Sequence, residues 1–403
     1  MQAQPASASA TPSPSPAANR PDYGKSLLPL WPLDPAIAYL NHGGYGATPH
    51  EVLADQQRWR LELERGPTRF MQRTLPEALR ANAAGLAHFL GAEPTDLVFV
   101  ENATQGINAV LRSLSFSAGD ELLTTTHVYG AVRNTMRHLA ERFGAKLVEA
   151  PLPYPLADSR TVIDSLAGHI NARTKLLVID LVTSPTALVL PVAALAAKAR
   201  AVGARILVDA AHAPGQIEFD LPGLGADYVT GNAHKWLFAP KGTAFLWARR
   251  DCQAGLHPTT ISHGLDQGFV TEFDWVGTRD PSAWLATSAA LAFYRRLGGS
   301  AIRAHNHALV NEAASLLSQR LGGEEGQSAR LRGAMATVRL AGFEGLDRPA
   351  ALALNDRLWR EHGIEVPIIP FGGSLWVRVS AQIYNEMADY RRLAEALLAL
   401  RGA

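Results

Sequence analysis

The sequence predicts an α/β protein with a mostly parallel seven-stranded sheet covered by helices, followed by a smaller α+β C-terminal domain. Seven short apolar runs occur at residues 97–100, 121–124, 146–150, 175–182, 204–209, 227–231 and 243–247. Helical patterns at residues 76–90, 105–114, 131–143 and 191–202 separate most of them. This alternation is typical of a parallel sheet with helices on both faces. The intervals after residue 209 are too short for a full helix at each turn, which predicts an antiparallel member among the last strands.

The pattern changes after residue 281. Long helical stretches follow at 283–296, 301–321, 348–362 and 386–400, with strand-like runs at 334–340, 364–369 and 375–379. We therefore divide the chain into a tail (1–25), an N-terminal arm (26–48), a large cofactor-binding domain (49–281) and a small domain (282–403). The tail is dominated by Ala, Pro and Ser, and we expect it to be disordered because it has too little apolar surface to offset the entropy of ordering.

The composition excludes several classes of function. The net charge of +1 and the absence of runs of like charge predict a small-molecule partner, and neither nucleic acid nor a membrane surface. A single cysteine, Cys252, rules out an intramolecular disulfide and a cysteine-rich metal site, and we expect no metal. No run of 18 apolar residues and no signal-peptide pattern is present, so we predict a cytoplasmic protein without a membrane span.

Lys235 is the first candidate for chemistry and lies in TGNAHKWLFAPKG, just after a short predicted strand. A lone lysine is normally a solvated surface charge. In a partly dry pocket, however, its amine loses a proton more easily and can form a Schiff base with an aldehyde cofactor. The neighbouring motifs have to decide between these two interpretations.

Asp209 ends an apolar run in ILVDAAHAPGQ, at the carboxyl end of a predicted parallel strand, where ligands bind in open α/β sheets. A carboxylate there suits the ring nitrogen of pyridoxal 5'-phosphate (PLP), because PLP withdraws electrons only while that nitrogen is protonated. The alternative is a helix cap or a salt-bridge partner. His212 is a candidate to bond the phenolate oxygen of PLP, with an ordinary loop histidine as the alternative.

The segment ENATQGIN leads from a predicted strand into a helix. Free backbone amides at such a helix start can hold a phosphate, which makes Ala103, Thr104 and Gln105 candidates. Asn and Thr are equally good helix caps, so this motif is weak when taken alone. With Asp209 and Lys235 it supplies a phosphate grip, a ring-nitrogen partner and an imine lysine in that chain order.

These residues resemble the class V aminotransferases of the PLP fold-type I superfamily, and within them the isopenicillin N epimerase-like branch. The resemblance covers about residues 38–320 and rests on YLNHGGYGATP, FVENATQGINAVLRSL, VTSPTALVLPV, VDAAHAPGQ, LGADYVTGNAHKWLFAPKG and WVGTRDPSAWLA. It implies a PLP fold-type I large domain, PLP as cofactor, an amino-acid substrate and a homodimer whose subunits share the active site.

The resemblance also implies roles for single residues around the cofactor. Lys235 matches the lysine that carries PLP, Asp209 the ring-nitrogen partner, His212 the phenolate contact, and Ala103 with Thr104 the phosphate grip. Four further residues match positions near the ring and the lysine: Tyr129, which would stack on the ring, Ser184, whose loop approaches it, and Asn232 and His234, which would assist the lysine.

Other positions relate to the substrate and the second subunit. Arg378 matches the arginine that binds the substrate carboxylate, an arrangement suited to bidentate pairing, with a strand-end salt bridge as the alternative. Asn41 and His42 resemble residues at the mouth of the active site. Gly277 and Thr278 resemble the pair that reaches the phosphate from the second subunit.

The reaction stays open, because removal of the substrate Cα proton can lead to epimerisation, transamination or loss of a β or γ substituent. Our first prediction is an isopenicillin N epimerase-like amino-acid epimerase. The alternatives are a C–S lyase on a cysteine conjugate or sulfoxide, similar to hercynylcysteine sulfoxide lyases, and a class V aminotransferase. Cys252 lies away from the expected position of a desulfurase's mobile thiol, so we do not predict persulfide formation. A PLP-sensing regulator would carry a basic helix-turn-helix domain, which the short Pro-rich N-terminal region lacks.

Overall fold

A computed structural model describes residues 22–343 and 347–401, and most of the predicted disordered tail therefore lies outside the described residues. The central sheet has the strand order β2-β8-β7-β6-β5-β3-β4. Only β8 runs antiparallel to its neighbours in this sheet, which confirms the predicted mostly parallel sheet and its antiparallel member. The strands are β2 (Leu97–Val100), β3 (Glu121–Thr125), β4 (Lys146–Ala150), β5 (Thr174–Asp180), β6 (Arg205–Asp209), β7 (Tyr228–Asn232) and β8 (Ala244–Ala248).

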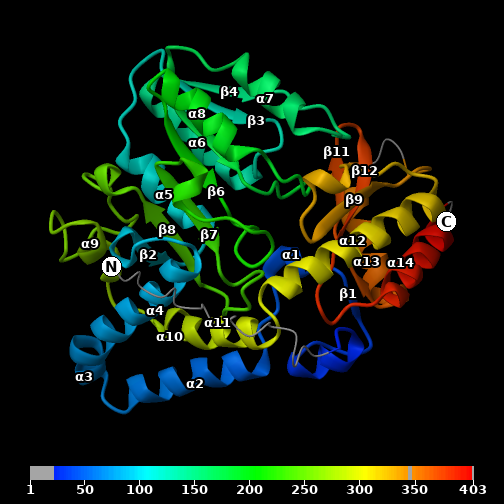
Figure 1. The fold of residues 1–403 in the computed structure, drawn as a ribbon, viewed down its shortest axis with the longest axis horizontal. Coiled ribbons are helices and arrows are strands. Elements are labelled where there is room, and N and C mark those ends of the chain that lie inside the picture. The colour runs from blue at the N-terminus through cyan, green and yellow to red at the C-terminus, as the bar shows by residue number, and fades with distance from the viewer. Residues whose placement is uncertain (1–21, 344–346, 402–403) are drawn as a thin grey trace, which may run out of the picture.

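Helices cover both faces of this sheet (Figure 1). Successive residues of β5 alternate between two cores: Leu176 and Val178 pack on one side, and Leu177 and Ile179 on the other. The first face is covered by α5 (Ala103–Ser113) and α6 (Gly130–Phe143), and the second by α4 (Leu75–Phe89), α7 (Ser159–Ala167), α8 (Val192–Ala201) and α11 (Thr287–Arg296). Burial on both faces is the reason that the strands are continuous apolar runs in the sequence.

The C-terminal part forms a second, smaller sheet with the antiparallel order β11-β12-β9, which confirms the predicted α+β character. Helices α12, α13 and α14 share its core. The predicted strand at 364–369 is divided into two strands around Pro367, because proline has no N–H group to continue a ladder. The elements are α12 (Ser300–Leu321), β9 (Met335–Arg339), α13 (Arg348–His362), β10 (Ile364–Glu365), β11 (Ile368–Phe371), β12 (Ser374–Ser380) and α14 (Met387–Leu400).

The N-terminal arm packs on this smaller part before it enters the large one. Lys25 forms an ion pair with Asp389 at 2.8 Å, and β1 (Ala38–Tyr39) pairs in parallel with β10. The short helix α1 (His42–Tyr45) follows and lies between the two sheets in Figure 1. The arm therefore carries the NHGGYG segment to the boundary between the two parts of the molecule.

The hydrophobic core of the large sheet continues beyond residue 282, the predicted start of the small domain. The predicted helix at 283–296 consists of α10 (Ser282–Leu285) and α11, and both bury side chains in the core of the large sheet. Within α12, Ile302 still belongs to that core, whereas Leu309 packs in the smaller one. Helix α2 (His50–Glu64) was not predicted, because it buries few side chains and its sequence is polar on most sides. Within the described residues, no helix is both long and apolar enough to cross a bilayer.

Candidate active site

A cavity of about 790 Å³ lies at the carboxyl ends of β5, β6 and β7, where they face α1 and β12. This is the edge at which open α/β sheets bind ligands. Eleven of the predicted site residues line it: Asn41, Ala103, Thr104, Tyr129, Ser184, Asp209, His212, Asn232, His234, Lys235 and Arg378. The structure thus brings together side chains from segments up to 337 positions apart in the chain.

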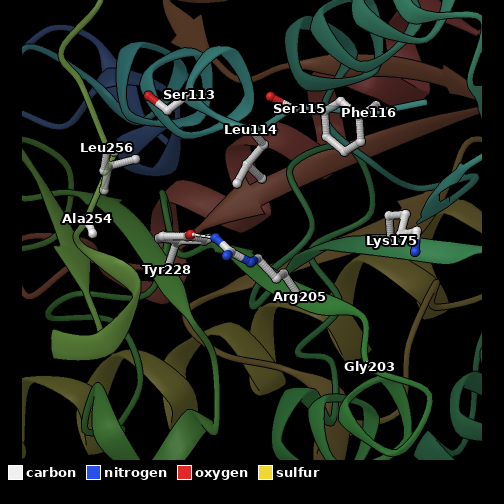
Figure 2. A pocket seen from close by; sticks show the side chains of 11 residues that line it. Ser113, Leu114, Ser115, Phe116, Lys175, Gly203, Arg205, Tyr228, Ala254 and Leu256 are labelled. Carbon is white, nitrogen blue, oxygen red and sulfur yellow. Dashed lines mark hydrogen bonds between the residues drawn. The ribbon is translucent and has the colours of Figure 1, made fainter.

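A second hollow, of about 370 Å³, lies at the opposite edge of the same sheet (Figure 2). Lys175, Arg205 and Tyr228 line it from the amino ends of β5, β6 and β7. None of the predicted site residues takes part in it, and its lining combines these polar groups with Leu114, Phe116 and Leu256. The chemistry predicted from the sequence therefore belongs to the first cavity.

The backbone around Lys235 is fixed from behind by the NHGGYG segment. The His42 imidazole is fully buried, with Nε2 3.0 Å from the Lys235 carbonyl oxygen and Nδ1 2.7 Å from the Tyr384 hydroxyl. Gly46 has a φ of +71°, and a Cβ there would lie 2.1 Å from the His234 carbonyl oxygen. His42, which the resemblance places at the mouth of the site, lies behind the lysine loop and does not line the cavity.

The Lys235 amine is partly buried and lies between groups of both charges. Its Nζ atom is 3.0 Å from His212 Nε2. Burial, and then the charge of Arg378, lower the pKa of Lys235 to about 7, while Asp209 opposes this shift. Burial also lowers the pKa of His212 far below its ordinary value. A substantial fraction of the lysine is then unprotonated near neutral pH, as a Schiff-base lysine requires.

Asp209 is the last residue of β6 and is buried at the floor of the cavity. Its Oδ1 atom accepts a hydrogen bond from the Ala211 amide at 2.8 Å. Burial raises the pKa of Asp209, while this hydrogen bond and the Lys235 charge act in the opposite direction. The carboxyl group is thus held in place without an ion pair among the described residues.

The backbone amides at the turn before α5 already form hydrogen bonds within the chain, which the sequence did not predict. Asn102 caps the helix by accepting from the Gln105 amide at 2.9 Å, and Asn232 Oδ1 accepts from the Ala103 amide at 2.9 Å. Gln105 does not line the cavity, and its side chain accepts from the Glu101 amide instead. Of the three candidates for the phosphate grip, Ala103 and Thr104 line the cavity and Gln105 does not.

Arg378 enters the cavity from β12 and meets two other predicted residues. Its guanidinium donates to the Ser184 carbonyl oxygen, and Nη2 lies 3.4 Å from Asn41 Oδ1. Burial lowers the pKa of Arg378 to about 10, so it remains a cation at neutral pH. Its hydrogen-bond partners within the described chain are neutral oxygens, which leaves its charge available to an anionic ligand.

Comparison with known proteins agrees with this geometry. The family model for aminotransferase class-V matches residues 39–393. The chain belongs to the class V aminotransferase family. An isopenicillin N epimerase of Amycolatopsis lactamdurans is 33% identical over 91% of this chain and 95% of its own length. A protein of Arabidopsis thaliana named "Probable L-cysteine desulfhydrase, chloroplastic" is 33% identical over 90% of this chain and 83% of its own length.

The fold is also similar to a solved structure, the apo form of a cysteine desulfurase from Thermococcus onnurineus NA1. Its TM-score is 0.78 with 20% identity, over 94% of this chain and 98% of that chain. This likeness supports the class V fold and carries no argument on the reaction. As a class V aminotransferase-family enzyme, the protein uses PLP as its cofactor.

The residues present fit PLP. The cavity holds a lysine with a depressed pKa, an anchored carboxyl group and, in His212, a buried Nδ1 atom that has no partner within the described chain. Thr104 lines the cavity at the start of α5 and would hold the phosphate there, because this helix end presents a positive dipole. When bound, PLP withdraws electrons from the substrate Cα.

Two of the predicted cofactor residues and the lone cysteine lie outside this cavity. Gly277 and Thr278 follow α9 (Phe269–Asp274), do not line it, and Thr278 is exposed. Cys252 is buried beside Asp227 at a Sγ–Oδ1 distance of 3.8 Å and also lies outside the cavity. Across the described ranges, no group of three or more His, Cys, Asp or Glu side chains is placed to hold a metal ion.

The sequence analysis missed several residues of the cavity, notably Tyr45, Glu101 and Asp180. Asp180 had a usable signal: it ends the strand beside the one that Asp209 ends, and the carboxyl ends of neighbouring parallel strands meet at one edge. Tyr45 stands within the quoted NHGGYG motif and is 72% exposed. Glu101 has no signal of its own, because a carboxylate after a strand is common.

Proposed function

We propose that this enzyme is a PLP-dependent C–S lyase that removes a sulfur substituent from Cβ of a cysteine-derived amino acid. The observation that carries the proposal is the position of Lys235, whose side chain is the only amine among the described residues that line the cavity and whose Nζ atom lies 3.0 Å from His212 Nε2. The pKa of Lys235 is about 7, whereas the pKa values of His212 and His234 fall well below neutrality, to about 4 for His234. Elimination needs a single base at Cα, which this arrangement supplies.

In this proposal Lys235 accepts the proton from Cα and later supplies the proton to the leaving sulfur. Arg378 binds the substrate carboxylate and thereby points the Cα–H bond toward Lys235 Nζ, which accepts the proton. The C–S bond then breaks, and its electron pair leaves with sulfur, which takes a proton from the Lys235 ammonium group. Water converts the released unsaturated amine to pyruvate and ammonia. The named relative from Arabidopsis thaliana, with its desulfhydrase description, is consistent with this route.

Amino-acid epimerisation is the second candidate, and it remains the one that the sequence analysis placed first. It requires proton return from the face of Cα opposite Lys235. The hydroxyl-bearing side chains of Tyr45 and Tyr129 line the same cavity and are 72% and 44% exposed, so either is a candidate acid for that face. The relative from Amycolatopsis lactamdurans supports this alternative.

Product analysis separates the two reactions. The PLP-loaded protein would be incubated in D₂O with L- and D-amino acids, S-alkyl-cysteines and cysteine sulfoxides, with Lys235→Ala as the matched control. We expect pyruvate, ammonia and a sulfur product in equal amounts from a cysteine derivative, and none from the variant. Exchange and inversion at Cα without pyruvate would replace the lyase proposal with the epimerase.

We further propose a homodimer in which Gly277 and Thr278 serve the phosphate site of the second subunit. Their loop lies outside its own cavity, yet Arg279 pairs with Glu101 at 3.4 Å, next to the turn that begins α5. Co-expression of Lys235→Ala and Thr278→Ala chains tests this. If Thr278 acts across the interface, the mixed dimer has one intact site and regains activity; if Thr278 acts within its own chain, the mixture stays inactive.

A further inference from the structure

A second carboxyl group lies beside the predicted ring-nitrogen partner. Strands β5 and β6 are parallel, and their register pairs Asp180 with Asp209, the last residue of each strand. Residues paired in this way in neighbouring strands point their side chains to the same face of the sheet. Both side chains line the cavity, and the residues are only 3% and 4% exposed. The floor of the active site thus contains two carboxyl groups, and the family resemblance implies a role for only one of them, Asp209.

Nothing within the described chain neutralises two negative charges at this place. Asp209 accepts from the Ala211 amide and feels the charge of Lys235. Asp180 receives backbone hydrogen bonds, one of them from Tyr129, but its Oδ2 atom is buried without a partner. The charge of Arg133 of α6 acts on Asp180, but Arg133 already pairs with Glu149 at 2.6 Å and donates to the Thr126 carbonyl oxygen.

Two adjacent buried carboxylates that form no direct ion pair are strongly unfavourable, because each loses hydration and repels the other. Asp209 has the stabilising contacts for the charged form, whereas Asp180 has an oxygen free to carry a proton. Burial, and then the charge of Asp209, raise the pKa of Asp180 well above its ordinary value. The geometry and the electrostatics therefore assign the single proton of the pair to the same residue.

We propose that Asp180 is a positioning residue held as the neutral carboxylic acid, so that the Asp180–Asp209 pair presents one negative charge to the cofactor. This inference rests on the proposed role of Asp209 as partner of the ring nitrogen. The protonated Asp180 keeps the charge on Asp209 without competing for the ring-nitrogen proton. Its backbone contact with Tyr129 also ties the start of α6, where the proposed ring-stacking side chain lies, to the same floor.

The direct test is carboxyl-¹³C NMR of the cofactor-free protein labelled at aspartate, titrated with pH. The Asp180 resonance is assigned as the one lost in Asp180→Asn. We expect it to have the chemical shift of a protonated carboxyl group at pH 7 and to ionise only above that pH. In Asp209→Asn, the neighbouring charge is gone, and the Asp180 midpoint should move down. An ionised Asp180 resonance at pH 7 would overturn the proposal.

Thermal unfolding gives a second, independent measurement. A proton bound at neutral pH by the folded state but not by the unfolded chain makes stability fall as pH rises through the folded-state pKa. Asp180→Asn removes that loss, so its Tm should increase relative to wild type as pH rises. A Tm difference that does not depend on pH contradicts the inference. If Asp180→Asn does not fold, the resonance whose midpoint moves down in Asp209→Asn is assigned to Asp180, and the absence of any such resonance overturns the proposal.

Failure of this inference is distinguishable from failure of the proposed cofactor site. The NMR and unfolding measurements use protein without PLP, and they report only on the carboxyl pair. PLP affinity of Asp209→Asn, followed by visible absorbance, reports on the ring-nitrogen assignment. If Asp180 is neutral but Asp209→Asn binds PLP with unchanged affinity, the protonation of Asp180 is confirmed and the role of Asp209 as partner of the ring nitrogen is refuted.

Discussion

Replacement of Arg378 by methionine tests how this enzyme holds its substrate. Methionine keeps a long unbranched side chain but has no charge and no N–H donor. Because the present partners of Arg378 are the neutral oxygens of Ser184 and Asn41, the variant breaks no ion pair of the described chain. The main loss should therefore appear only when an anionic substrate is bound.

The size of this loss follows from the burial of the guanidinium. Removing one partner of a buried, hydrogen-bonded charge pair costs about 2–5 kcal/mol. At about 1.4 kcal/mol for each factor of ten, kcat/KM should fall by roughly 30-fold to 4,000-fold. Arg378→Lys keeps the charge but loses the two-pronged geometry, so it should lie between wild type and Arg378→Met.

Steady-state kinetics with a cysteine derivative would measure the effect, together with the visible absorbance of bound PLP and the Tm. We expect the increase in KM to account for most of the change, with cofactor absorbance preserved. The half-exposed helical residue Arg357, which lies outside the cavity, supplies a control, and Arg357→Met should leave all three quantities unchanged. A kcat/KM in Arg378→Met within a few-fold of wild type would refute the assignment of Arg378 to the substrate carboxylate.

Further expectations concern the lysine and its surroundings. Lys235 becomes a free amine only after the substrate has displaced it from the cofactor, so its pKa of about 7 governs kcat. We expect kcat to rise with pH through about 7 and to fall about tenfold per pH unit below it; a flat kcat profile from pH 5 to 8 would contradict this. Asn232→Ala leaves the Ala103 amide at the start of α5 without its hydrogen-bond acceptor, at a cost of about 1–3 kcal/mol. We expect a lower Tm and, by equilibrium dialysis, weaker PLP binding; an unchanged Tm and an unchanged PLP affinity would show that Asn232 does not position this turn. Gly46→Ala places a Cβ 2.1 Å from the His234 carbonyl oxygen at a positive φ. It should lower Tm more than the control Gly203→Ala, because Gly203 also has a positive φ, +79°, but has no atom near the position of the new Cβ. Equal losses of Tm would show that the close approach to His234 does not contribute to stability.

The sequence was sufficient to predict the central sheet, because its strands are buried on both faces and form uninterrupted apolar runs. Helix α2 escaped prediction since it buries only Val52 and Gln56 and therefore has little apolar periodicity. The strand predicted across Pro367 was wrong because hydrophobicity outweighed the missing N–H group in that interpretation. Packing, and not local pattern, also decided that α10 and α11 belong to the large core.

The sequence predicted where site residues lie along the strands better than it predicted where their side chains point. The sequence placed Lys235, Asp209 and Thr104 at one edge of the sheet, because each lies at or shortly after the end of a strand. Gln105 shares a motif with Thr104, and His42 belongs to the NHGGYG motif, but their side chains contact the backbone of Glu101 and Lys235, respectively. Such directions are set by tertiary contacts and cannot be obtained from spacing alone.

Lys235 is the proposed attachment site of the cofactor, and mapping that site is the decisive measurement. The PLP-loaded protein would be reduced with borohydride, digested and analysed by mass spectrometry for a pyridoxyl-lysine. We expect the modification on Lys235 and its loss in Lys235→Ala. Lys241 is the informative competitor, because its amine is also partly buried but donates to the Gly46 carbonyl oxygen at 3.1 Å, outside the cavity lining. Modification of Lys241, or of no lysine, would contradict the account.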